Sequence, residues 1–553
     1  MKKIITISLF LMMLFDISAQ TTFTVDGIKY QTTSTTEVMV IRNTTNPYSG
    51  NITIPNTVTS SDVIYNVTSI YSTSTSYADD SKNGAFRGCE GLTSVIIPNS
   101  ITSIGESAFS GCTNLISINI PNTVTSIGSY AFSYCLNLNS VNIPNSVTTI
   151  EYGAFSECSS LTSIAFPNSV KTIGSGAFSN CSSLTSVTIP ISVDSIGGTV
   201  FRYCRNISVI SISNKNIKIG SNNIIGLTNL RKIIVPANFI NLVDDFRDIS
   251  SESNNYTTKL DSVTIISGEI NNNALKFLKL SNRTLKNLDI KESTNTALTE
   301  EFLYNFYSLE SLEFPKNLQK IQYKEFTECM ALKEIMLPAT VTEIGKRSFE
   351  NCRSLKTVTF EANSQLKTID NWAFYACHGL QSLTIPNGAT TIGDGAFWGC
   401  DYMTNVSLPS SMKSISDNGF EGCISINKMT VESTLPPTVF TNTFNKVNKN
   451  IHLYVPDESV SLYKSAFGWK DFYNIKGTST KLTSTEESNY LINITNRSIE
   501  ITNATSKSIK AFDISGRKVF ETSNAQDSEQ FTVNSKGVYI IAIDNFKKKI
   551  MVY

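Results

Sequence analysis

The feature that most constrains this chain is a unit of 23 residues that returns along most of residues 84–431. Residues 104–126, IGESAFSGCTNLISINIPNTVTS, are a representative copy, with one Cys, one Phe and one Pro among regularly spaced aliphatic residues. Self-similarity at a fixed period is the signature of architectures in which each unit packs on its neighbours. The length of 553 residues therefore does not indicate how many globular domains the chain forms.

Cysteines mark the copies of the unit. The first six lie 23 residues apart, and the last five follow at intervals of 23, 25, 23 and 23: Cys89, Cys112, Cys135, Cys158, Cys181, Cys204, Cys329, Cys352, Cys377, Cys400 and Cys423. Between the two groups the leucine pattern continues and places other residues in the cysteine position: Leu227, Thr257, Asn282 and Phe306. We therefore predict about fifteen continuous units, with extra residues near 240–256.

Each unit is predicted to form one coil with two short extended pieces. Residues 115–120 alternate and are β-branched, which predicts a strand, and Pro121 ends it because proline has no N–H to donate. A second extended piece is expected at 124–127. Residues 128–135 are expected to make one helical turn that points an Ala and a Phe inward. Stacked coils would pair their strands in parallel.

The pattern IGxxAFxxCxxLxxVxIPxSVTx, repeated over 84–200 and 321–431, resembles the BspA-type leucine-rich repeats of bacterial surface proteins. Residues 205–306 depart from it by losing the cysteine. The resemblance implies a leucine-rich-repeat solenoid of parallel short strands with helical turns. It also implies a location on the cell surface, often with a role in adhesion to host proteins or other cells.

The N-terminus has the pattern of a signal peptide, residues 1–19. Two lysines precede an apolar run at 4–15, and Ser18-Ala19-Gln20 offers a cleavage site. The run is too short to cross a bilayer, and no other stretch is apolar enough to be a membrane helix. A buried N-terminal strand is the alternative. Residues 20–83 are predicted to be an N-terminal cap, with a hairpin, a half-repeat from Asn51 and a hydroxyl-rich insertion at 70–82.

A C-terminal cap is predicted at 432–476, after the repeat solenoid of residues 84–431. Residues 451–456 have the pattern of a strand and 459–469 that of an amphipathic helix. Five aromatic residues favour a cap over a linker: Tyr454, Tyr463, Phe467, Trp469 and Phe472. The polar run 477–488 is predicted to be a flexible linker.

Residues 489–553 alternate like a small all-β sandwich. They resemble the C-terminal sorting domain of type IX secretion substrates, with its series IYDxxGRxV, GxYIxxI and KxxV. The matching positions are Asp513, Gly516, Arg517, Val519, Gly537, Tyr539 and Lys549. The resemblance implies recognition by an outer-membrane secretion machinery, and it implies no catalysis.

Composition and motifs argue against several functions. The chain has 46 Lys and Arg residues and 46 Asp and Glu residues, so it has no net positive charge that would favour binding of nucleic acid. The eleven cysteines occupy one phase of the coil, which favours small core residues over disulfides or zinc ligands. His378 and His452 belong to no catalytic motif. We expect no catalytic residue, cofactor or metal; a carbohydrate-active enzyme within 236–305 is the remaining enzymatic alternative.

Between the aliphatic residues of each strand lie outward positions that form columns down the stack. The candidate ligand-binding face consists of Ser117, Asn119, Ser140, Asn142, Ser186, Thr188, Thr357, Thr359, Ser382 and Thr384. Tyr375 and Trp398 are candidate contact anchors. The function hypothesis is an exported, adhesin-like protein that binds an extracellular protein or glycan. The alternatives are that the hydroxyls only solubilise the sheet, and that the protein is a structural spacer or surface-layer component.

Overall fold

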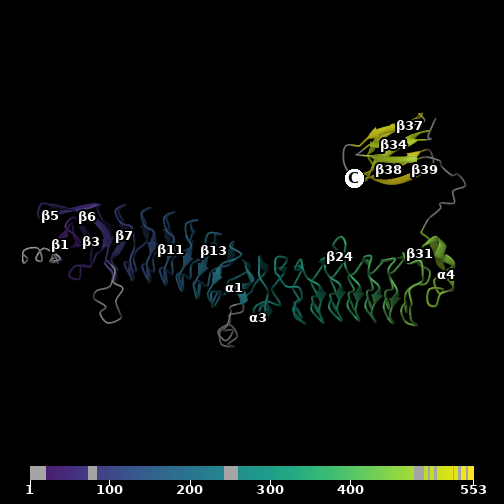
Figure 1. The fold of residues 1–553 in the computed structure, drawn as a ribbon, viewed down its shortest axis with the longest axis horizontal. Coiled ribbons are helices and arrows are strands. Elements are labelled where there is room, and N and C mark those ends of the chain that lie inside the picture. Colours follow the sequence, from purple (N-terminus) through teal and green to yellow (C-terminus); the bar gives the residue numbers. More distant parts are fainter. Residues whose placement is uncertain are drawn as a thin grey trace, which may run out of the picture. The chain divides into compact units, whose positions relative to one another are not determined.

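The computed structural model describes residues 20–71, 84–241, 259–478 and, apart from 496–497, 503–506, 527, 534–536 and 544–545, residues 491–552 (Figure 1). The predicted signal peptide, most of the hydroxyl-rich insertion, the extra residues near 240–256 and most of the predicted linker lie outside the described residues. The chain divides into two compact units, Met1–Thr478 and Ser479–Tyr553.

The first unit begins with a mixed sheet. Its strand order is β1-β2-β3-β6-β5, with β1 at Thr22–Val25, β2 at Ile28–Thr32, β3 at Glu37–Val40, β6 at Val63–Ile70 and β5 at Thr57–Ser60. Strand β4 (Gly50–Thr53) instead pairs in parallel with β7 (Leu92–Ile96), the first strand of the repeats. The half-repeat at Asn51 therefore joins the stack of coils.

The first strand of each coil forms a parallel ladder, drawn as successive arrows in Figure 1. After β7 come β8 (Ser117–Asn119) and β10 (Ser140–Asn142), then β13 (Ser186–Ile189), β15 (Val209–Ile212), β17 (Lys232–Val235), β18 (Ser262–Ile265), β19 (Asn287–Asp289) and β20 (Ser311–Glu313). The last ladder holds β22 (Glu334–Leu337), β24 (Thr357–Phe360), β26 (Ser382–Thr384), β28 (Asn405–Leu408), β30 (Lys428–Val431), β31 (His452–Val455) and β32 (Asn474–Gly477). The predicted leucine-rich-repeat solenoid is confirmed, and it continues through the cysteine-free middle.

A second ladder of two-residue strands runs beside the first. It consists of β9 (Ser126–Ile127), β11 (Thr149–Ile150), β12 (Thr172–Ile173), β14 (Ser195–Ile196) and β16 (Lys218–Ile219), and later of β21 (Lys320–Ile321), β23 (Glu343–Ile344), β25 (Thr368–Ile369), β27 (Thr391–Ile392) and β29 (Ser414–Ile415). Equivalent residues face each other in both ladders, as Ile150 faces Ile127 and Ile173. One coil therefore repeats the contacts of the next.

The predicted helical turn is wrong: residues 128–135 form a series of tight turns. The N–H groups of Tyr130, Phe132 and Tyr134 donate to carbonyls of the next coil at 2.7–2.8 Å, whereas the N–H groups between them donate three residues back. Tyr130 and Tyr134 have φ of 55° and 57°, in the left-handed region that an α-helix does not contain. Glycine, which tolerates this φ without strain, takes the position of Tyr134 in other coils: Gly88, Gly111, Gly226, Gly399 and Gly422.

Phenylalanines form a continuous spine inside the coils. From Phe86 to Phe201, successive rings stack with centroids 4.9–6.3 Å apart. From Phe326 to Phe444 the spacing is 5.1–6.1 Å. Between the two stretches Ile224 and Leu303 occupy the position and are buried as well. The core therefore stays continuous where the aromatic stack is interrupted.

Two short helices distinguish the middle of the solenoid. Helix α1 spans Ala237–Asn241 and helix α3 spans Asn272–Lys279, with the Asn271 side chain accepting hydrogen bonds from two N–H groups of the first turn. Ala274, Phe277 and Leu278 of α3 are buried. The described residues of 236–305 therefore keep the parallel ladder through β18 and β19, and the tight turns of the regular coils return at 301–305.

The last coils are closed by a short segment with aromatic side chains. Here β31 and β32 extend the ladder, and the turn η1 (Asp457–Ser459) and helix α4 (Val460–Ser465) lie between them. The helix is shorter than the predicted 459–469. Trp469 packs at 5.0 Å on Phe444, the end of the spine, and its indole N–H donates to the Pro437 carbonyl at 2.8 Å. Phe467, expected to belong to the cap, is 62% exposed.

The second unit consists of two antiparallel sheets. One has the order β33-β34-β37 (Leu491–Thr495, Ser498–Thr502, Ser528–Thr532), and the other β36-β35-β38-β39 (Lys518–Thr522, Ile509–Asp513, Gly537–Ile543, Phe546–Val552). Phe520 of one sheet stacks on Phe531 of the other at 4.1 Å. Ile499, Ile509 and Ile541 are buried between the sheets.

Candidate ligand-binding face

All ten residues of the candidate face are exposed on the first ladder. Strand register places Ser117 beside Ser140 and Asn119 beside Asn142. It also places Thr357 beside Ser382. The ladder is broken between β10 and β13, where residues 163–166 form no strand, and again between β20 and β22. The ten residues therefore form separate groups, not one uninterrupted column.

One of these groups lines a groove. Strands β22 and β24 pair at four positions and β26 and β28 at three, but β24 and β26 pair only at Thr357 and Ser382. The connection after Phe360 is two residues longer than the equivalent segment after Leu337, and the two strands separate beyond the paired residues. The groove between them has a volume of about 590 Å³.

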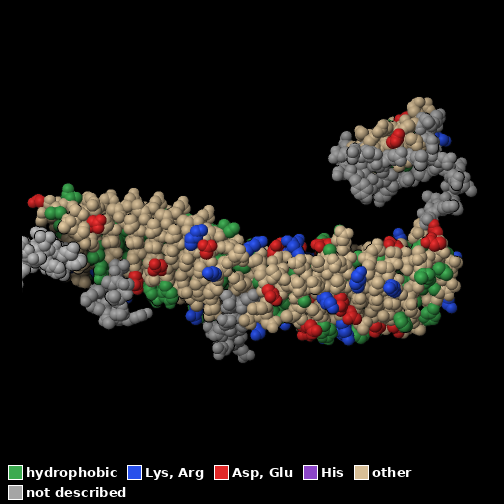
Figure 2. All heavy atoms as spheres, viewed as in Figure 1, with side chains coloured by type: hydrophobic (Ala, Val, Ile, Leu, Met, Phe, Trp, Pro, Cys, Tyr) green, Lys and Arg blue, Asp and Glu red, His purple; other side chains and the backbone are tan. Residues whose placement is uncertain are grey.

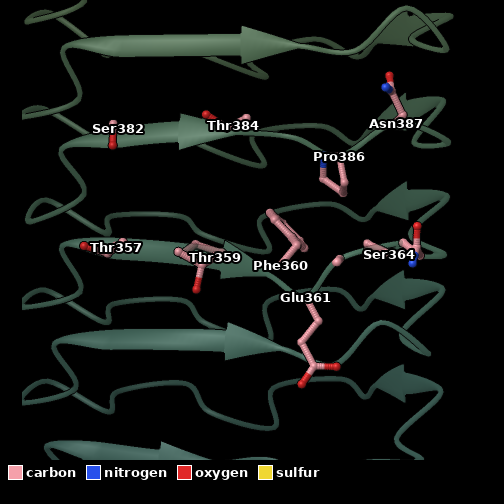
Figure 3. A pocket seen from close by; sticks show the side chains of 12 residues that line it. Thr357, Thr359, Phe360, Glu361, Ser364, Ser382, Thr384, Pro386 and Asn387 are labelled. Atoms are coloured by element: carbon pink, nitrogen blue, oxygen red, sulfur yellow. The ribbon is translucent and has the colours of Figure 1, made fainter. Parts of the chain in front are cut away.

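The groove brings together four of the ten predicted residues, Thr357, Thr359, Ser382 and Thr384 (Figure 3). The Thr359 hydroxyl donates to the Ile335 carbonyl at 3.1 Å. Among the described residues, the hydroxyls of the other three bond to no protein group. Hydroxyls of this kind can donate to or accept from a ligand without losing an internal bond.

The groove's remaining lining combines apolar and polar groups. It consists of Val358, Phe360, Glu361, Ala362, Asn363, Ser364, Pro386 and Asn387. The Glu361 carboxylate accepts from the Ala339 N–H at 3.0 Å, and Figure 3 shows it directed away from β26. The Phe360 ring is directed toward Pro386. The groove thus presents neutral hydroxyls beside an aromatic ring.

Comparison with known families identifies the repeats. The description "BspA type Leucine rich repeat region (6 copies)" matches residues 48–156, 79–208, 125–248, 247–380 and 367–497. The chain belongs to the BspA-type leucine-rich repeat family. No curated protein matches the sequence.

Several solved structures resemble the chain. A leucine rich cell surface protein from Faecalibacterium prausnitzii is 25% identical over 74% of this chain and 94% of its own, with a TM-score of 0.34. A leucine-rich repeat protein from Bacteroides ovatus is 23% identical over 82% and 99%, with a TM-score of 0.31. The T. pallidum leucine-rich repeat protein is 29% identical over 38% and 90%, with a TM-score of 0.32.

The BspA-type cysteines are core residues. All eleven are free thiols and buried. In ten of them Sγ donates at 3.0–3.3 Å to a carbonyl of the preceding coil, that of Phe or, for Cys329, Leu303. Burial raises the pKa of the Cys158 thiol to about 12, so the nucleophilic thiolate is scarce at neutral pH. Within the described part of the chain, no group of three His, Cys, Asp or Glu side chains could hold a metal ion.

The proposed aromatic anchors are less accessible than expected. Tyr375 and Trp398 are half-buried and pack edge-to-face at 5.6 Å on each other. Sequence reasoning overlooked Trp372, whose ring lies 4.7 Å from the Arg347 guanidinium carbon and 5.1 Å from the Lys346 Nζ. Aromatic side chains on this edge therefore pack mainly against neighbouring coils of the BspA-type stack.

Coil stacking also creates a pair that sequence reasoning missed. His378 Nδ1 lies 2.9 Å from Asp401 Oδ2, and both side chains are about 40% exposed. The two residues are 23 apart, so adding one period to the position of His378 would have found Asp401. Their contact is an ion pair only when the histidine is protonated.

In the second unit, three predicted motif residues close one tight turn between β35 and β36. The Asp513 carboxylate accepts from the backbone N–H and the Nε of Arg517, both at 3.0 Å. The Ser515 hydroxyl and Arg517 hold the pKa of Asp513 below its usual value. Gly516 has φ of 83°, which favours glycine. Tyr539 is buried beside Asp513 in the strand register, and Gly537 and Lys549 lie in β38 and β39.

Proposed function

We propose that this protein is an exported surface protein without enzymatic activity, and that its solenoid binds an extracellular protein or glycan through the first-ladder face. The observation that carries the proposal is the β24–β26 groove, where three hydroxyls have no partner among the described residues. A solenoid offers such a face because each coil contributes its outward side chains in register.

Export rests on the two ends of the sequence. Residues 1–19 have the charge and apolar pattern of a signal peptide. The C-terminal unit resembles a type IX sorting domain, and the bonds between Asp513 and Arg517, which join two of the motif positions in one turn, support this assignment. Within the described residues, none of the helices has the length and apolar character that crossing a bilayer requires.

The ligand-binding part is tested with the full chain on a glycan array and on a panel of extracellular matrix proteins. We expect at least one class to bind. Thr384→Lys should weaken that binding by filling the groove, whereas Thr125→Lys, on an exposed position outside the first ladder, should not. A protein that binds neither class would be the structural spacer or surface-layer component instead.

The export part is tested by deleting residues 489–553 in the native host. We expect the shortened protein to remain in the periplasm, measured by surface labelling of intact cells and by fractionation. If it still reaches the surface, the assignment of a sorting function to the C-terminal unit is wrong. The double variant Asp513→Ala and Arg517→Ala, which opens only the turn, separates loss of the motif from loss of the whole unit.

A further inference from the structure

Phe360 departs from the rule that its position follows in the other coils. It stands in register with Leu337, which is fully buried, whereas Phe360 is only half-buried. Two other coils have phenylalanine at the same point after the strand. Phe166 and Phe314 turn inward, with exposures of 9% and 4% and edge-to-face contacts to the spine at 5.6 and 5.4 Å.

The longer connection accounts for this difference. Phe166 and Phe314 are each followed by proline, whereas Phe360 is followed by Glu361 and the two extra residues. Among the described residues, Phe360 packs partly against the core without stacking on a ring of the spine, and its ring extends toward Pro386 across the groove (Figure 3). A side chain that is fully buried in neighbouring coils here packs only partly against the core and also lines the groove.

From this geometry we propose that the β24–β26 groove is a subsite for a neutral carbohydrate, with one sugar ring lying on Phe360. This rests on the proposed function and specifies its ligand. A sugar presents an apolar face of C–H groups and a rim of hydroxyls, and the groove offers an aromatic ring beside the partner-free hydroxyls of Thr357, Ser382 and Thr384.

Charge and size fit the same ligand. The only charged residue in the lining is Glu361, and its carboxylate is bonded to the Ala339 N–H and directed away from the groove. An anionic ligand would therefore find no cation in the lining. The volume of about 590 Å³ lies within the range of small-molecule pockets, roughly 300–1,000 Å³.

A peptide strand fits less well. Strand addition requires a free sheet edge. Strand β24 is already paired with β22 on one side and β26 with β28 on the other, and the two strands still pair with each other at Thr357 and Ser382. An extended peptide would have to break that pair, whereas a ring lying above it would not.

The test uses the full chain on an array of neutral, sulfated and sialylated oligosaccharides, followed by affinity measurements for the neutral ones that bind. Phe360→Leu restores the residue type of Leu337 and removes the aromatic ring; we expect about tenfold weaker binding. Thr384→Val keeps the shape and removes a free hydroxyl; we expect about fivefold weaker binding. Thr125→Val makes the same change at an exposed position outside the first ladder; it is the control and should bind as the parent does.

The outcomes separate this inference from the proposed function. Neutral-sugar binding that Phe360→Leu and Thr384→Val both leave unchanged would overturn the subsite while the proposed function stands. The subsite is equally overturned if the chain binds only anionic glycans or only matrix proteins. A chain that binds no glycan and no protein would overturn both. Unfolding of each variant by urea, expected to match the parent, confirms that a loss of binding is not a loss of folding.

Discussion

The solenoid contains two blocks of regular coils, residues 84–204 and 320–431, that share a core and differ outside it. Both have the stacked phenylalanine spine and the thiol-to-carbonyl bonds. In the first block, side-chain bonds between coils join two neutral groups, as in the Ser110–Ser133 contact at 2.9 Å, or a neutral group and a carboxylate, as in Asn180–Glu157 at 2.7 Å. In the second, charged pairs such as Lys320–Glu343 at 2.8 Å also link the coils, and Figure 2 shows charged side chains scattered over these coils.

The difference teaches that the repeat specifies the core of both blocks, and that the second block has departures from the repeat of its own. Its longer interval between Cys352 and Cys377 creates the groove. Its coil at Glu325 buries a carboxyl group at a position where Ala373 and Ala396 stand in other coils. A search for function is therefore best directed at coils that break the pattern, and four measurements can challenge this view.

The largest loss of stability is expected from removing one phenylalanine ring from the spine in either block. Phe155→Ala and Phe374→Ala each remove a fully buried ring between two stacked neighbours. Each should cost about 3–5 kcal/mol of stability, because the cavity cannot collapse between coils held by backbone bonds. Urea unfolding followed by circular dichroism measures the loss. If one block tolerated the change and the other did not, the two cores would not be equivalent.

The next largest effect is a pH dependence of stability that is expected only in the second block. Glu325 is buried, its Oε1 has no hydrogen-bond partner within the described chain, and burial raises its pKa to about 8. Since the folded pKa exceeds the unfolded value of 4.5, the folded state holds the proton more tightly, and stability falls as pH rises from about 4.5 to about 8.

Glu325→Gln removes this titration. Relative to the variant, the parent should lose about 2 kcal/mol or more between pH 5 and pH 9, measured as urea midpoints at both pH values. Glu151→Gln, an exposed residue of the first block, serves as the control and should follow the parent. Parallel pH curves for Glu325→Gln and the parent would show that the carboxyl is not desolvated.

A smaller effect is expected from the thiols, and it should be equal in the two blocks. Cys158→Ala and Cys400→Ala each remove a buried sulfur and its bond to a phenylalanine carbonyl, at 3.1 and 3.3 Å. We expect about 1–2 kcal/mol for each. A thiol titration should count eleven reactive groups after denaturation without reductant and almost none before it. A count of two or fewer after denaturation would establish disulfides instead.

The smallest effect is expected from the exposed charges. Lys320→Ala removes the pair with Glu343, whose two side chains are partly exposed and screened by salt, so the unfolding midpoint of the variant should be nearly that of the parent. The informative quantity is the salt dependence of the difference in unfolding midpoint between variant and parent. Raising the ionic strength should change this small difference for Lys320→Ala, whereas the difference for Ser133→Ala in the first block should stay constant. Equal salt responses would remove the electrostatic distinction between the blocks.

The sequence predicts those features of the coil that recur in every period. The strand ending before Pro121, the inward Phe132 and the buried Cys135 follow from the spacing of apolar residues, and the structure has all three. The left-handed turns do not follow from it, because Tyr130 and Tyr134 are residue types that rarely adopt positive φ. Only the recurrence of glycine at equivalent positions indicates them.

The candidate site was predictable in part. Outward hydroxyls such as Thr357 and Ser382 follow from strand alternation. The groove between them does not, because the extra residues after Phe360 show that a connection is longer without showing which way a side chain turns. Full burial, as for Phe166, would have been the natural expectation for Phe360, which is instead half-buried and lines the groove.

The in-register pairing of equivalent residues bears on how such a chain changes in length. Thr149 lies between Ser126 and Thr172, one period on either side. If one whole period were removed from the first block, the coils on either side of it would meet through equivalent residues and make the same contacts. An inserted period would likewise find equivalent residues on both sides. Gains and losses of whole coils are therefore nearly neutral for folding, whereas a deletion of any other size moves inward side chains to the surface. Solenoids of different length can arise by recombination between coils, without any new core having to evolve.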